Sequence, residues 1–133
     1  MTGREFPTPW TVWLHRFTPS ATNAHGVPGK AWTPARGSTG EAVKVIAWSN
    51  NGPTFEPEQN RSVERLEMFI PPVLRSADSG EAVDDPGPMD VIDLPDGRGG
   101  TIEYEVQGWP RDYTHGFHGW QAGKVIDLQR VEG

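Results

Sequence analysis

The sequence predicts an all-β fold: a small antiparallel β-barrel or sandwich, formed as a single domain of about six short strands with long Gly- and Pro-rich loops. Three observations favour this class. The chain has 133 residues, including 16 Gly and 13 Pro, which is nearly double the ordinary usage of these residues. Its apolar stretches are short and are separated by turn signals. Its clearest periodicity, in residues 102–107, is a two-residue alternation typical of a half-buried strand.

The composition also excludes several classes of protein. The chain contains no cysteine, so a disulfide scaffold, a Cys-based zinc site and a thiol nucleophile are all excluded. No apolar stretch is long enough for a signal peptide or a membrane span, and we expect a soluble, intracellular protein. One domain of this length can bury a core without disulfides or metals.

The first predicted strand runs from Trp10 to Phe17, because this stretch is rich in β-forming residues and lies between Pro9 and Pro19. Residues 19–40 follow, with three Pro, four Gly and five Ser or Thr and no periodicity. We predict that they form one long loop. Loops of this length are uncommon in compact domains and are usually functional or disordered, so this loop is the first candidate for an interaction element.

The next two strands are predicted in residues 42–49 and 61–74. The first is closed by a turn signal, Asn51-Gly52-Pro53. The second alternates from Leu66 to Ile70 as a strand does, although its apolar residues also fit one face of a helix. We predict a strand, which Pro71-Pro72 ends.

Three more strands are predicted in the C-terminal part of the chain. Residues 89–94 and the alternating residues 102–107 form a hairpin around the turn signal Asp96-Gly97. Residues 109–123 are a connection rich in Gly and aromatic residues, and residues 124–131 form the last strand.

Charge is distributed unevenly along the chain. The net charge is −6, but residues 1–40 carry +3 and the remainder carries −9. Nine acids and one base, Arg98, lie between Asp78 and Glu105. This argues against tight nucleic-acid binding, which depends on Lys and Arg to neutralise phosphates. The acidic run is either a solvated face or a surface that DNA passes without adhering.

The six tryptophans fall into two groups. Those in apolar strands are expected in the core, because large aromatic side chains dominate core packing; they are Trp10, Trp13 and Trp48. Those in Gly- and Pro-rich connections either fold back over the barrel or anchor a partner; they are Trp32, Trp109 and Trp120.

No group of residues predicts catalysis. Asp112, His115 and His118 have the spacing D-x-x-H-x-x-H, but they lie in a Gly-rich loop without the helical frame of known zinc motifs. The chain contains no G-x-S-x-G motif, and the glycines of residues 97–100 lie in a predicted hairpin rather than at the start of a helix. We therefore predict no enzymatic activity, no metal and no cofactor.

The C-terminal third contains an ordered set of short motifs. An Asp-apolar strand leads to an Asp-Gly turn, then to a strand ending Tyr-x-Val-x-Gly with a following Pro, and finally to a Gly-x-Val-Ile-x-Leu strand with a terminal Glu-Gly. The residues are Asp90, Asp96-Gly97, Tyr104, Val106, Gly108, Pro110, Gly123, Val125, Ile126, Leu128 and Glu132-Gly133. Over residues 89–133 the chain resembles the head-to-tail stopper, or head-completion, proteins of long-tailed bacteriophages.

The resemblance implies a structural protein of the virion neck, made in the host cytoplasm. It implies a β-barrel that assembles into a homo-oligomeric ring, with the portal and adaptor proteins on the head side and the tail terminator or tail tube on the tail side. Such a ring retains the packaged double-stranded DNA and lies close to it without sequence-specific contact. The family has no catalytic residues and no cofactor, and the resemblance implies no membrane partner.

Two surfaces follow as hypotheses from this resemblance. The 19–40 loop and the connection tryptophans are assigned to subunit or partner contacts, or to channel closure: His25, Lys30, Trp32, Arg36, Trp109 and Trp120. An acidic face toward the lumen or solvent is assigned to Asp84, Asp85, Asp90 and Asp93. The bases of the N-terminal part, Arg16, Lys30 and Arg36, would face an acidic partner or the tip of the DNA.

One alternative belongs to another functional class. The chain would then be a monomeric β-barrel or sandwich binding module. Its ligand platform for a sugar or a peptide would consist of Trp32, Trp109 and Trp120.

Overall fold

The computed structural model describes residues 6–20, 29–56, 61–115 and 122–132. Within these residues the structure is all-β and antiparallel, as the sequence predicts, and contains no helix. The strands are β1 (Trp10–Ser20), β2 (Gly29–Thr33), β3 (Glu41–Val45), β4 (Ala47–Glu56), β5 (Arg61–Ile70), β6 (Arg75–Ser76), β7 (Val91–Pro95), β8 (Thr101–Val106), β9 (Arg111–Tyr113) and β10 (Gly123–Glu132).

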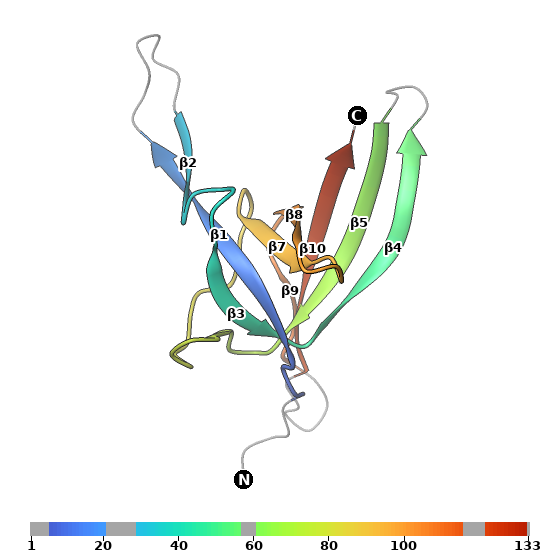
Figure 1. Cartoon of the computed structure of the whole chain (residues 1–133). Helices are drawn as coiled ribbons and strands as arrows, with labels where there is room; N and C mark the ends of the chain where they lie inside the picture. The colour runs from blue at the N-terminus through green and yellow to red at the C-terminus, as the bar shows by residue number, and fades with distance from the viewer. Residues whose placement is uncertain (1–5, 21–28, 57–60, 116–121, 133) are drawn as a thin grey trace.

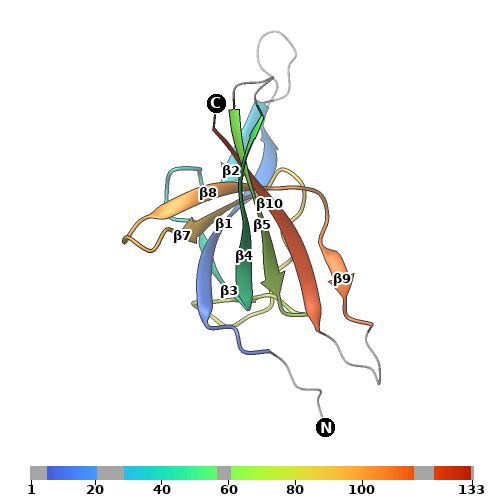
Figure 2. The same cartoon turned by 90° about the vertical axis from the view of Figure 1, so that its right-hand side faces the viewer.

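The strands form one sheet that curls into an open half-barrel. Their order is β4-β5-β10-β8-β7-β1-β3-β6, with β2 paired to β1 and β9 paired to β10. Figure 1 shows two walls, one of β1, β2 and β3 and the other of β4, β5 and β10. In Figure 2, the β7–β8 hairpin projects to one side of these walls.

The two walls meet where the chain passes from β3 to β4. The connecting residue, Ile46, donates its N–H to the carbonyl oxygen of Phe69 in β5 (2.9 Å). We call this the closed end of the half-barrel. At the opposite end, β1 with β2 and β4 with β5 extend away from each other as two separate arms (Figure 1).

The hydrophobic core lies between the walls. Alternate residues of each long strand point into it, as the two-residue period of a strand requires. The most deeply buried members, each exposed by 1% or less, are Val12, Leu14, Val43, Val45, Met68, Ile70, Leu74, Ile92, Ile126 and Leu128. These apolar side chains come from both walls, and their removal from water supplies the main driving force for folding.

The C-terminal predictions are confirmed most closely. Residues 101–106 form β8, in which Tyr104 and Val106 are buried while Glu105 is exposed. The predicted hairpin turn is present, because the N–H of Asp96 donates to the carbonyl oxygen of Gly100 (3.0 Å). The ambiguous segment 61–74 is a strand, β5, up to Ile70.

The predicted 19–40 loop is partly wrong. β1 continues to Ser20 and pairs with β2, in a register from Arg16 opposite Thr33 to Ser20 opposite Gly29. Here β1 has β2 on one edge alone, so the missing N–H of Pro19 interrupts no second ladder. Residues 34–40 remain irregular, and residues 21–28 lie outside the described part of the chain.

Two further turn and strand boundaries also differ from the prediction. The strand predicted in residues 42–49 is divided at Ile46 into β3 and β4. The signal Asn51-Gly52-Pro53 does not end β4, because it forms an irregularity where the register with β5 shifts. Bulges and prolines of this kind are characteristic of edge strands, and β4 is the edge of the sheet. The predicted connections also contain the short strands β6 and β9.

The prediction that Trp10, Trp13 and Trp48 lie in the core is only partly correct. Trp48 packs against the core, but Trp10 is 52% exposed, with its ring edge on Trp48 at 5.6 Å between centroids. Trp10 is the first residue of β1, at the closed end, where little of the sheet extends beyond it. Trp13 alternates with the buried Val12 and Leu14, and it therefore lies on the opposite face of β1 and is only partly buried.

Candidate interaction surface

Two of the interaction residues predicted from the sequence, Trp32 and Trp109, contact one tight turn, Gly87–Asp90, which we call the Met89 turn. The N–H of Asp90 donates to the carbonyl oxygen of Gly87 (3.1 Å), with Pro88 and Met89 between them. Met89 has a φ of 75°, whereas the sequence predicted it as the start of a strand. β7 begins only at Val91, because this turn holds the backbone out of the sheet.

Asp90 fixes the Met89 turn to the sheet. Its Oδ1 accepts a hydrogen bond from the N–H of Phe17 in β1 (2.8 Å), and its Oδ2 accepts one from the N–H of Gly87 (2.9 Å). The side chain is buried, with Asp90 9% exposed. The hypothesis that Asp90 belongs to a lumen or solvent face is therefore wrong, because two backbone donors draw its carboxylate inward.

We expect Asp90→Ala to lower the free energy of unfolding by about 2–3 kcal/mol, because it leaves two backbone donors without their charged acceptor. Urea unfolding followed by tryptophan fluorescence measures the loss. Asp78→Ala is the matched control, since Asp78 is an exposed acid, and its effect should stay within about 0.5 kcal/mol. Equal effects of the two substitutions would show that Asp90 does not hold the turn.

Trp32, in β2, folds back onto the same turn. Its Nε1–H donates to the carbonyl oxygen of Met89 (2.8 Å), and its ring meets Phe17 edge-on at 5.6 Å between centroids. The Arg36 guanidinium lies 4.7 Å from the centre of the Trp32 ring. Arg36 also forms an ion pair with Glu103, and this hydrogen bond is the main cause of its raised pKa. The base expected to meet an acidic partner is thus paired within its own chain.

Trp109 contacts the turn as well, through Gly87. A Cβ on Gly87 would lie 2.7 Å from Cζ3 of the Trp109 ring, so a side chain at this position would displace the ring. Trp109 nevertheless remains 75% exposed. Trp32 and Trp109 are therefore brought to one turn, but the third tryptophan of the predicted platform, Trp120, lies outside the described residues, as does His25.

The remaining predicted acids do not form one face. Asp84 is exposed, and its carbonyl oxygen accepts a hydrogen bond from Arg16 (2.7 Å). Asp85 forms an ion pair with Lys124. Asp93 bonds to the buried His15, so it too departs from the predicted solvent face.

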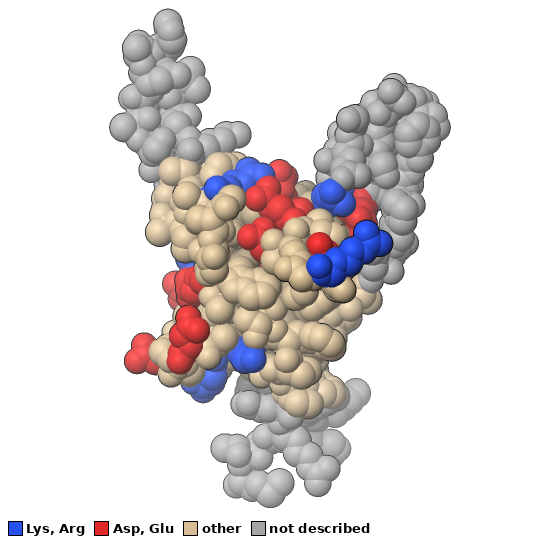
Figure 3. All heavy atoms as spheres, viewed as in Figure 1, with Lys and Arg blue, Asp and Glu red and all other residues tan. Residues whose placement is uncertain are grey.

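Acids and bases are mixed on the surface in Figure 3. The positive N-terminal part of the sequence and the negative remainder neutralise each other in part through the pairs of Arg16 with Glu41 and Arg36 with Glu103. Lys30 lies in β2, opposite Pro19 of β1.

A cavity of about 430 Å³ adjoins the Met89 turn. One part of its lining is apolar or aromatic, and the other is polar or charged. The lining residues are Trp32, Arg36, Pro88, Met89, Val91, Glu105, Val106, Gln107 and Gly108. A cavity of this volume is within the range of sites that bind small ligands or single protein side chains.

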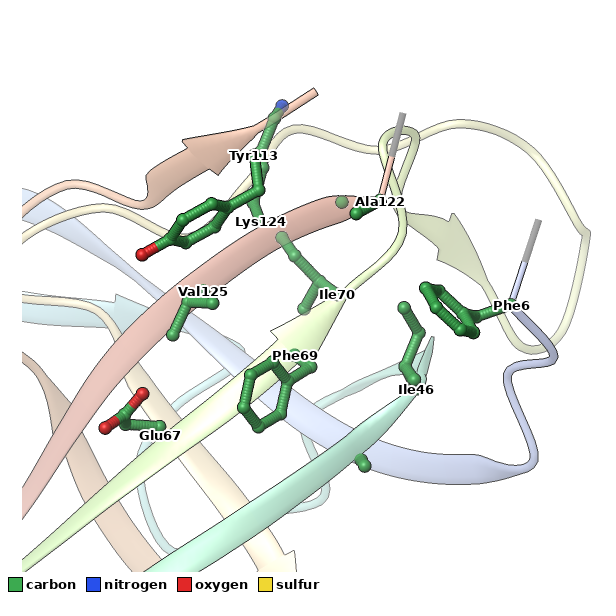
Figure 4. Close-up of a pocket in the computed structure, with 11 residues that line it drawn as sticks. Phe6, Ile46, Glu67, Phe69, Ile70, Tyr113, Ala122, Lys124 and Val125 are labelled. Atoms are coloured by element: carbon green, nitrogen blue, oxygen red, sulfur yellow. The ribbon is translucent and has the colours of Figure 1, made fainter. Parts of the chain in front are cut away.

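A second surface, which the sequence reasoning missed, lies on the outside of the closed end. Phe6, Ile46, Phe69, Tyr113 and Val125 line an apolar pocket of about 510 Å³ there (Figure 4). We call it the closed-end pocket. Its signal in the sequence is the loss of alternation: consecutive apolar residues, as in Met68-Phe69-Ile70 and Val125-Ile126, place apolar side chains on both faces of a strand.

The D-x-x-H-x-x-H segment is only partly described. Asp112 accepts hydrogen bonds from the hydroxyl and the N–H of Thr114, and these bonds lower the pKa of Asp112. His118 lies outside the described residues. Within the part of the chain that is described, no three His, Cys, Asp or Glu side chains are grouped as metal ligands.

Comparison with family models, curated proteins and solved structures finds no match for this chain. Among the described residues, no helix is long and apolar enough to cross a bilayer.

Proposed function

We propose that this chain is a structural protein of a phage neck: a head-to-tail stopper that assembles into a homo-oligomeric ring and retains packaged DNA. The ring joins the portal and adaptor proteins on its head side to the tail terminator or tail tube on its other side. The sequence resemblance supports this proposal. Among the described residues, those that carry the resemblance lie in β8 and β10 or in the segments next to β7 and β8.

The observation that carries the proposal is the presence of two separate apolar surfaces. Phe6 and Tyr113, 47% and 51% exposed, line the closed-end pocket, while Met89 and Trp109, 43% and 75% exposed, lie at the Met89 turn. Exposed apolar residues that gather around a pocket are typical of surfaces where a partner binds. A ring subunit in a virion neck contacts several neighbours at once, which requires more than one such surface.

The two arms of the half-barrel are the second support. The β1–β2 arm contains Lys30 and Trp32, and it extends from the core on the side opposite the β4–β5 arm (Figure 1). We assign the β1–β2 arm to contacts with neighbouring subunits or to channel closure. The net charge of −6 fits a ring that DNA passes, because a protein of this sign binds polyanions weakly.

Deletion of the gene from the genome that carries it tests this proposal. Negative-stain electron microscopy of the resulting particles should show separate tails beside heads that have lost their DNA, and a complementing copy should restore joined particles. Normal tailed particles after deletion would overturn the proposal. So would quenching of tryptophan fluorescence by a soluble glycan with saturable binding, because that result belongs to a monomeric binding module.

A further inference from the structure

The Met89 turn holds a methionine in a backbone conformation that residues with a side chain rarely adopt. Pro88 and Met89 are the second and third residues of a four-residue turn, and Met89 has a φ of 75°. A Pro followed by a residue of positive φ is the pattern of a type II turn, whose third position favours Gly or Asn. A Cβ in this region is strained, so methionine lowers the stability of the chain relative to glycine.

The strain is maintained by contacts on several sides of the turn. The Asp90 carboxylate accepts a hydrogen bond from β1, and the Trp32 indole N–H donates one to the Met89 carbonyl oxygen. The Trp109 ring lies over Gly87. The Met89 side chain itself is 43% exposed, so its burial within this chain offsets little of the strain. Strained residues that are held in this way are typical of binding and active sites.

The adjoining cavity has a defined chemical character. Trp32, Met89 and Val91 supply aromatic, thioether and aliphatic surface, and a methionine adapts readily to the shape of a partner. Arg36 at the wall is already paired with Glu103, whereas Glu105, also in the lining, is exposed. Arg36, Glu103 and Glu105 together leave one net negative charge beside the apolar surface.

We propose that the Met89 turn and its cavity bind a segment of a partner protein that presents an apolar side chain next to a Lys or Arg. The apolar side chain contacts Met89 and Trp32, and the base faces Glu105. Charge complementarity selects this occupant over an acidic segment, since a carboxylate would meet Glu105, and Arg36, the base among the lining residues, is already paired with Glu103. The inference goes beyond the neck assignment, because it applies to the purified chain in any assembly.

The test is selection of a random dodecapeptide library on the purified, immobilised full chain. We expect enriched peptides that share an apolar residue beside Lys or Arg. Their affinity, measured by fluorescence anisotropy of labelled copies, should fall at least tenfold on Met89→Gly and at least tenfold on Glu105→Lys. Met89→Gly should at the same time raise the Tm by several degrees, because it relieves the strain, so the lost binding does not reflect unfolding.

Two matched controls locate the binding. Tyr113→Ser changes the closed-end pocket, and Glu81→Lys reverses an exposed acid that does not line the cavity. Both should leave peptide affinity within twofold. The inference would be overturned if no peptide is enriched, or if the enriched peptides lack basic residues. It would also be overturned if the Met89→Gly protein binds the peptides as tightly as the original chain, or if the Tyr113→Ser protein loses binding.

Discussion

Gly123→Ala is expected to abolish most of the stability of the fold. Gly123 has a φ of 128°, and a Cβ there would lie 2.2 Å from the carbonyl oxygen of Ile70 and 3.6 Å from Cα of Pro71. The atoms that such a Cβ would meet belong to the backbone of β5 and Pro71, so they cannot move aside as a side chain can. The β10–β5 ladder begins at the next residue, where Lys124 lies opposite Ile70. Relief of the clash therefore requires this end of the ladder to separate. We expect a loss of about 4 kcal/mol or more, out of a total that is typically 5–15 kcal/mol.

Circular dichroism during urea unfolding measures this loss, and Gly37→Ala is its control. Gly37 also has a positive φ, of 85°, but a Cβ there would meet nothing within 4 Å. Its substitution should therefore cost about 1–2 kcal/mol, from backbone strain alone. If the two substitutions reduce stability equally, the close approach of β10 to β5 is not the reason that position 123 is glycine.

Asp93→Ala is expected to have the second largest effect. His15 is fully buried, and its Nδ1 lies 2.8 Å from the carbonyl oxygen of Pro34 while its Nε2 lies 2.8 Å from Oδ2 of Asp93. The two ring nitrogens are therefore held between a backbone carbonyl of the 34–40 segment and a carboxylate of β7. Asp93→Ala leaves Nε2 of a fully buried ring without its carboxylate partner, and we expect this to cost about 3 kcal/mol.

Two variants separate the charge from the packing at this site. Asp93→Asn keeps an oxygen acceptor for His15 and should lose less stability than Asp93→Ala in the same urea experiment. Glu81→Ala removes an exposed acid and should change stability by about 0.5 kcal/mol at most. An Asp93→Ala protein as stable as Glu81→Ala would contradict a structural role for the His15–Asp93 pair.

Local patterns in the sequence were sufficient for the fold class and for the C-terminal hairpin. The alternation of residues 102–107 and the Asp96-Gly97 turn act over a few residues, so β7 and β8 follow from them. β2 did not follow, because its Gly29–Thr33 segment has little β character of its own and becomes a strand by pairing with β1. Trp10 was misplaced because its exposure depends on where the sheet ends.

For the candidate interaction surface, the sequence indicated two of the residues at the Met89 turn but not the geometry of the turn. Trp32 and Trp109 stand out in the sequence as aromatic residues in Gly- and Pro-rich segments, and both contact the Met89 turn. Asp90 was placed on the surface because a charge pattern cannot show that two backbone donors will surround one carboxylate. Met89 was missed because the strain depends on its φ, which composition does not encode.

Immunogold labelling of purified particles tests the central claim most directly, namely that this chain is a component of a phage neck. Antibodies raised against the purified chain are applied to intact tailed particles and viewed by negative-stain electron microscopy, with particles grown from the gene-deleted genome as the control. The neck assignment predicts gold at the junction of head and tail. Gold confined to the capsid shell or the tail tip, or particles that contain none of the chain, would contradict it.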